Sequence, residues 1–100
     1  MTMMIEMRTY TLVPGGVKEY LRIYNETGRS VQLEILGQLV SLMTPETGEL
    51  NQLVFLWAFP SFEARRERRA RLMTDDRFTE FRKSVRHLLV SQENRLLNAV

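Results

Sequence analysis

The most strand-like stretch of the chain is Leu50–Phe59, where aliphatic and aromatic residues follow one another without a charged side chain. Pro60 ends it. Because nearly every position is apolar, both faces of this strand are expected to be covered. One layer of helices covers one face of a sheet. In a chain of 100 residues, the other face is expected to be covered by a second copy of the protein.

Three further segments have the patterns of strands. Residues 3–12 alternate between side chains that point to opposite faces, and residues 38–44 are mostly apolar. The turn Pro45–Gly48 then predicts an antiparallel hairpin with the central strand. The tail, Ser91–Ala99, is ambiguous between a helix end and a strand, and is interpreted as a strand because it completes a four-stranded sheet.

Apolar residues at helical spacing predict a first helix that ends at Gly37. Gly28 lies on the inner stripe of this helix, where it lets the helix approach the sheet closely. Ser61 is predicted to cap a second helix, and Asp75 or Thr74 a third.

This order of elements predicts a single α+β domain over residues 1–100, a ferredoxin-like sandwich with helices on one face of a four-stranded antiparallel sheet. The open face is predicted to carry aromatic side chains beside polar ones: Arg8, Tyr10, Asn51, Leu53, Phe55 and Trp57. Such a face is too apolar to stay broadly exposed to water. Pairing with a symmetry mate into a dimeric α+β barrel is therefore expected.

Composition narrows the classes of function. The chain has no cysteine, which excludes disulfides, thiolate metal sites and thiol catalysis. The N-terminus lacks the pattern of a signal peptide, and the apolar run Leu53–Phe59 is far shorter than the roughly 20 residues that cross a bilayer. A cytoplasmic protein without membrane contact is therefore predicted.

Arginines are concentrated in the second predicted helix: Arg65, Arg66, Arg68, Arg69 and Arg71. Such a cluster can indicate a nucleic-acid partner. Glu63 and Glu67 lie among these arginines at spacings that allow ion pairs, and no helix-turn-helix signature accompanies them. A solvated helix face is therefore the favoured interpretation, and a nucleic-acid partner is not expected.

Several segments, in their order and spacing, resemble the NIPSNAP family: Arg8–Gly15, Gly48–Gln52, Leu56–Ala58, Asp75–Phe78 and Ser91–Leu96. The resemblance spans essentially the whole chain and is to the short, single-domain bacterial members. It implies a dimeric α+β barrel, related in fold to small cofactor-free monooxygenases, without an established reaction. Many members of the family have a histidine in the central strand where this chain has Phe55, which weakens the case for a strand histidine as general base.

Arg8 and Tyr10 share one face of the first strand. Inside a barrel, Arg8 can bind a carboxylate or phenolate while Tyr10 donates a hydrogen bond. Arg8 can also pair with Glu6, with Glu93 or with an acid of a partner chain, and this structural role is favoured.

The other candidates also have two interpretations. Phe55 and Trp57 can line an aromatic pocket, but aromatic residues on a buried strand more often form core. Asn51 can contact a ligand, although an amide next to a turn more often satisfies backbone groups. Glu93 and Asn94 can act as general base and orienting amide, or can fasten the last strand. Glu93 is the acid/base candidate because the resemblance places Gln-Glu-Asn there.

The only histidine, His87, cannot build a metal site without nearby carboxylates, and a helix-capping role is favoured. No metal or cofactor is predicted. Two functions remain open. One is a barrel that binds a small aromatic or carboxylated molecule, with cofactor-free oxygenation or isomerisation suggested by analogy of fold. The other is a non-catalytic homodimeric scaffold that presents its arginine-rich helix to an acidic partner.

Overall fold

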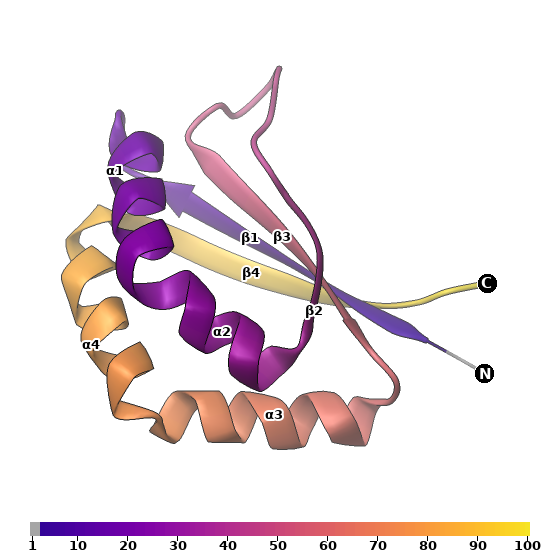
Figure 1. Ribbon diagram of the computed structural model, residues 1–100. Coiled ribbons are helices and arrows are strands. Elements are labelled where there is room, and N and C mark those ends of the chain that lie inside the picture. The colour runs from indigo at the N-terminus through magenta and orange to yellow at the C-terminus, as the bar shows by residue number, and fades with distance from the viewer. Residues whose placement is uncertain (1–2) are drawn as a thin grey trace.

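A computed structural model describes residues 3–100, which form an antiparallel four-stranded sheet with all helices packed on one face (Figure 1). The ferredoxin-like α+β fold predicted from the sequence is confirmed. The single domain predicted over residues 1–100 includes residues 1 and 2, which lie outside the described part of the chain.

The sheet has the strand order β2-β3-β1-β4, so the first and third strands lie at its centre. Its strands are β1 (Met4–Leu12), β2 (Gln38–Met43), β3 (Gln52–Phe59) and β4 (Leu89–Asn98). All three pairings are antiparallel. The predicted hairpin of β2 and β3 and the predicted C-terminal strand are both present.

The helical elements are α1 (Gly16–Ile23), the π-helical segment η1 (Tyr24–Gly28), α2 (Arg29–Leu36), α3 (Phe62–Thr74), α4 (Asp76–Val85) and the 3₁₀ turn η2 (Arg86–Leu88). Gly37, with a positive φ of 96°, ends α2 as predicted. Ser61 caps α3 by accepting a hydrogen bond from the Ala64 amide at 3.1 Å, and Asp75 caps α4 by accepting one from the Arg77 amide at 2.9 Å. Among the described residues, no helix is both long and apolar enough to cross a membrane.

The first predicted helix is continuous and bent, with η1 joining α1 to α2 (Figure 1). Gly28 closes η1 and permits a close approach, as expected. The element that it approaches is α4 and not the sheet, because a Cβ atom at Gly28 would lie 2.8 Å from the ring of Phe81. A glycine is therefore required where η1 touches α4.

The hydrophobic core lies between the sheet and the helices. Leu53, Phe55 and Trp57 project from β3 into this core and are at most 1% exposed. Tyr10, which is paired with Leu53 across β1 and β3, is also buried. The prediction that Arg8, Tyr10, Leu53, Phe55 and Trp57 lie on the open face is therefore wrong, because these side chains face the helices.

The open face carries the alternate residues of the same strands, and it is apolar too. Ile5 and Met7 of β1 lie beside Ala58 and Leu56 of β3, and the side chains of Ile5, Met7 and Leu56 are only partly covered within the chain. Leu97 of β4, opposite Ile5, is 36% exposed. Both faces of β3 are therefore apolar, as its sequence predicts, although the residues assigned to each face were exchanged.

Candidate functional site

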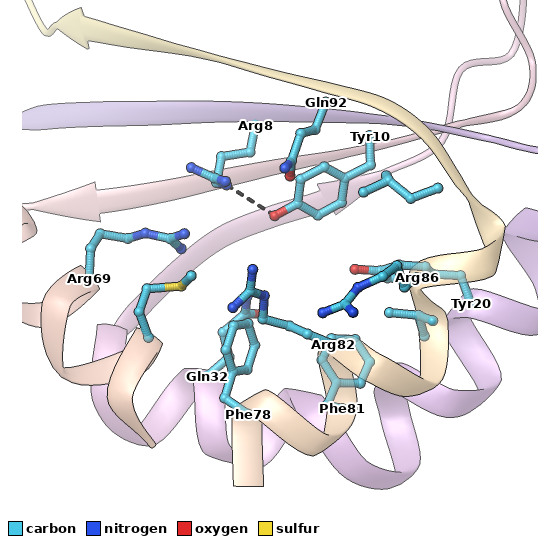
Figure 2. A pocket seen from close by; sticks show the side chains of 13 residues that line it. Arg8, Tyr10, Tyr20, Gln32, Arg69, Phe78, Phe81, Arg82, Arg86 and Gln92 are labelled. Carbon is cyan, nitrogen blue, oxygen red and sulfur yellow. Dashed lines mark hydrogen bonds between the residues drawn. The ribbon is translucent and has the colours of Figure 1, made fainter. Parts of the chain in front are cut away.

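A cavity of about 240 Å³ lies between the strands β1 and β4 and the helices that cover them (Figure 2). Its walls combine aromatic, amide and arginine side chains from β1, β4 and all the helical elements except η1. The lining residues are Arg8, Tyr10, Tyr20, Gln32, Arg69, Met73, Phe78, Phe81, Arg82, Val85, Arg86, Leu89 and Gln92. No acidic side chain is among these described lining residues.

Aromatic rings form one wall of the cavity. Phe78 and Phe81, which are three residues apart on α4, have ring centroids 5.6 Å apart, and Tyr20 of α1 meets Phe81 edge-on at 5.8 Å. Burial, together with Tyr10 and Tyr24, raises the pKa of Tyr20 above its usual range, so its hydroxyl stays protonated. This wall offers flat apolar surface against which a ring or chain of a small molecule can pack.

Arg8 is held between a carboxylate and a phenol. Its Nη1 donates to Glu6 Oε2 at 3.0 Å, and its Nε donates to Tyr10 Oη at 3.0 Å. Because the Tyr10 oxygen already accepts from Arg8, the hydroxyl proton of Tyr10 is left to donate into the cavity that its ring faces (Figure 2). The structural role favoured for Arg8, an ion pair with Glu6, is confirmed.

Glu6 is fully buried and joins three elements of the fold. Its Oε2 accepts hydrogen bonds from Arg8, from Arg65 of α3 at 2.7 Å and from Asn94 of β4 at 2.8 Å. Burial alone would raise the pKa of the Glu6 carboxyl. The hydrogen bonds from Arg65 and Asn94 and the charge of Arg8 outweigh burial and lower the pKa to about 2. Glu6 is therefore ionised throughout the neutral range.

Three further arginines, Arg69, Arg82 and Arg86, reach the cavity from α3, α4 and η2. None of them forms an ion pair within residues 3–100. The Nη1 atom of Arg69 is buried and has no hydrogen-bond partner in the described part of the chain. Burial and the nearby charge of Arg8 lower the pKa of the Arg69 guanidinium. The cavity is therefore strongly electropositive.

The structure brings together only some of the residues that the sequence singled out. Arg8 and Tyr10 line the cavity, and Asn94 is linked to Arg8 through Glu6. Phe55 packs behind Tyr10, with ring centroids 5.4 Å apart, and Trp57 stacks on Phe55 deeper in the core. These two aromatic side chains are not among the lining residues.

Three other candidates do not line the cavity. Asn51 precedes β3, and its backbone carbonyl accepts a hydrogen bond from the Leu12 amide at 2.7 Å. Glu93 is exposed on β4, where it is paired with Thr9 on the open face of the sheet. His87 lies exposed in η2. Within residues 3–100, no cluster of three or more His, Cys, Asp or Glu side chains could hold a metal ion.

The arginines of α3 and α4 were not predicted as site residues. A fully solvated face is the wrong interpretation for α3, because Arg65 binds Glu6 and Arg69 lines the cavity. A signal was available, since Arg65 and Arg69 precede the buried Leu72 at helical spacing. Arg82 in turn follows the buried Phe78 by one helical turn.

The NIPSNAP family model matches residues 5–100 of the chain. This protein belongs to the NIPSNAP family. Among curated proteins, none matches the chain. A NIPSNAP family protein of unknown function from Agrobacterium tumefaciens is 39% identical, with a TM-score of 0.94 and coverage of 97% of this chain and 87% of that one. An uncharacterised NIPSNAP-like domain protein from Burkholderia xenovorans is 33% identical, with a TM-score of 0.92 and coverage of 95% and 83%.

The NIPSNAP fold extends to more distant proteins. A protein from Caulobacter crescentus with the provisional name antibiotic biosynthesis monooxygenase is 17% identical, with a TM-score of 0.71 and coverage of 98% of this chain and 90% of that one. At this identity, the likeness shows a shared fold and nothing of the reaction. The function of this NIPSNAP protein must therefore be argued from its own cavity.

Proposed function

We propose that this NIPSNAP protein binds a small aromatic anion, such as an aromatic carboxylate, in the cavity between the sheet and the helices. The observation that carries the proposal is the charge of the walls: four arginines and no acidic residue line one cavity within the described chain. Arginine is suited to this role because its planar fork matches the two oxygens of a carboxylate. The aromatic wall of Tyr20, Phe78 and Phe81 supplies a surface for the apolar part of the ligand.

The size of the cavity supports a small ligand. Its volume of about 240 Å³ lies below the roughly 300–1,000 Å³ of pockets that hold drug-sized molecules. For a reaction, the support is only the fold shared with proteins provisionally named monooxygenases, and by this analogy we propose cofactor-free oxygenation or isomerisation. Glu93 does not line the cavity, so the proposal gives it no part in binding.

Binding of benzoate and of its uncharged counterpart benzyl alcohol, followed by isothermal titration calorimetry, tests the proposal. We expect benzoate to bind and benzyl alcohol to bind at least tenfold more weakly, since only benzoate can accept charge-assisted hydrogen bonds. Tyr10→Phe removes one donor and should weaken benzoate roughly 2- to 10-fold. The control Thr9→Val removes a hydroxyl from the open face of the same strand and should change nothing.

The proposal would be contradicted if benzoate and benzyl alcohol bound with equal affinity. It would also be contradicted if Tyr10→Phe and Thr9→Val weakened benzoate binding equally. No binding of either probe would favour the alternative function, a non-catalytic scaffold. In that case the exposed arginines of α3, such as Arg66 and Arg71, would be the surface for an acidic partner.

We also propose that the protein forms a homodimer through its open sheet face. The partly covered Ile5, Met7 and Leu56 form a continuous apolar surface across the two central strands. Met43 of β2 and Leu97 of β4 extend it and are 42% and 36% exposed. Burial of this surface against a second copy is favourable because it removes apolar area from water.

Sedimentation velocity tests the dimer. The protein is expected to sediment as a dimer, and Leu56→Arg as a monomer, because an unpaired charge would be buried in the interface. Leu33→Arg makes the same change at a residue of α2 that is 37% exposed, and this control should remain dimeric. A monomeric wild-type protein, or a Leu56→Arg variant that stays dimeric, would refute the proposed interface.

A further inference from the structure

The cavity holds more positive charge than one carboxylate can balance. Arg69, Arg82 and Arg86 come from three consecutive helical elements, and Figure 2 shows their side chains pointing into the same space. Arg8 differs from these three because it pairs with Glu6, whose single charge it shares with Arg65. The other three guanidinium groups have no carboxylate partner within residues 3–100.

Among the cations of α4, the one without a carboxylate partner in the described chain is the one that lines the cavity. Two other cations of this helix have carboxylate partners, since Arg77 Nη2 lies 2.9 Å from Asp75 and Lys83 Nζ lies 3.6 Å from Glu80. Arg82 sits next to Lys83 in the chain but lines the cavity instead. Nearby acids, Asp75 and Glu34 for Arg77 and Glu80 for Lys83, therefore pair with the outward cations of α4, and the charge of Arg82 is left for a ligand.

We propose that the ligand of this cavity carries a dianionic group, a phosphate monoester or a pair of neighbouring carboxylates, held by Arg69, Arg82 and Arg86. This inference rests on the proposed function and deepens it by naming the charge of the ligand. A carboxylate has one charge and two oxygens, whereas a phosphate monoester has a charge of about −1.5 to −2 and three free oxygens. Three guanidinium groups match the second set better, because each can donate two parallel hydrogen bonds.

The arrangement of the walls also orients such a ligand. The dianionic group is placed among the three arginines, and the apolar part lies on the ring wall of Phe78 and Phe81. Tyr10 and Gln92 of the strands are then free to bind a polar atom of the ligand beside Arg8, which donates to the Tyr10 oxygen at 3.0 Å. The cavity therefore has an arginine cluster on its helical side and hydrogen-bonding groups on its strand side, and such a division fixes one orientation of a small molecule.

Calorimetric titration at low salt with phenyl phosphate, phthalate and benzoate tests the inference. Phenyl phosphate or phthalate should bind at least tenfold more tightly than benzoate, and the tighter of the two identifies which dianion the site prefers. Arg82→Gln and Arg86→Gln should each weaken the dianion roughly tenfold or more. Both side chains are exposed enough that folding should be unaffected. Lys83→Gln is the matched control, because it removes a cation from α4 that does not line the cavity.

The ionisation of the probe gives a second readout. Phenyl phosphate gains its second charge near pH 6, so its affinity should rise roughly tenfold between pH 5 and pH 7. Benzoate is already ionised in that range and should show a flat profile. Glu6, with a pKa of about 2, keeps its charge throughout. The pH profile of phenyl phosphate binding is measured again in His87→Gln, because His87 is the only histidine of the chain. The profile should be the same in this variant if the charge of the probe causes the rise.

The outcomes separate this inference from the proposed function. The inference fails, while the proposed function stands, if benzoate binds as tightly as both dianions and neither Arg82→Gln nor Arg86→Gln changes the affinity for the dianions. If Lys83→Gln weakens the dianions as much as Arg82→Gln does, general attraction explains the binding and the inference fails. If none of the three probes binds, both proposals fall.

Discussion

The Glu6→Gln variant is expected to be about 3 kcal/mol less stable than the wild-type protein at pH 7. Glu6 is fully buried and balances Arg8 and Arg65. Glutamine keeps the shape of the side chain but leaves these two guanidinium groups without a counter-charge. The loss should be measured as the free energy of unfolding in urea, with α3 and β4 loosened because both are tied to Glu6.

The pH dependence of stability provides an independent check. Folding lowers the pKa of Glu6 from 4.5 to about 2, so the unfolded state binds more protons between these values. The stabilisation from Glu6 is therefore fully present above about pH 5 and is lost as the pH falls towards 2. A shift of this size corresponds to about 3 kcal/mol. The Glu6→Gln variant should lose less stability than the wild-type protein over this interval.

The matched control for this prediction is Glu26→Gln. The Glu26 side chain is 61% exposed and pairs with Arg22 on the surface of α1 and η1. Exposed ion pairs contribute little, so its unfolding free energy should hardly change. Equal stabilities of Glu6→Gln and wild type at pH 7 would show that the buried charge cluster does not hold the three elements together.

Phe55→Ala is expected to cost about 3–5 kcal/mol of stability. Phe55 is 1% exposed and contacts the rings of Tyr10, Tyr24 and Trp57. Removal of its ring leaves a void in the middle of the aromatic core. Such a loss is a large part of the roughly 5–15 kcal/mol that stabilises a typical domain. Urea unfolding followed by circular dichroism measures it.

The same variant separates two roles for Phe55. A core residue should lose stability when truncated, whereas a residue that only contacts a ligand should lose affinity and keep its stability. Phe62→Ala is the control, because Phe62 is 53% exposed on α3 and its truncation should leave stability nearly unchanged. A Phe55→Ala variant as stable as the wild type would revive the ligand-contact interpretation.

The elements of this fold were predictable because their signals are local. Ser61 and Asp75 cap α3 and α4, Gly37 ends α2, and the turn at residues 45–48 enforces the hairpin. Each of these signals acts within a few residues of itself. The dimer through the open face stays a proposal, because the sequence pattern supports it only through the apolar character of both faces of β3.

The orientation of the sheet was not predictable in the same way. Alternation in β1 separates two faces but does not say which one the helices cover. Glu6 and Arg8 lie on the covered face, where Glu6 pairs with Arg65 of α3, and this partner lies 59 positions away from Glu6 in the sequence. The cavity depends on the same kind of long-range placement. Arg8 and Tyr10 are two residues apart on one strand, but Arg69 and Arg82 meet them only through the packing of α3 and α4.

The pairing of β1 with β4 has a consequence for the order of folding. Met4 is paired with Asn98, so this contact closes a far longer loop than the hairpin of β2 and β3 does. Long loops close slowly, because the entropy of closure is lost before the contacts are made. We therefore expect β4 to dock last, and until it docks, one edge of β1 is unpaired and the wall that β4 contributes to the cavity is missing. This partly folded form exposes a strand edge that the finished fold covers, and it is the form most prone to aggregation.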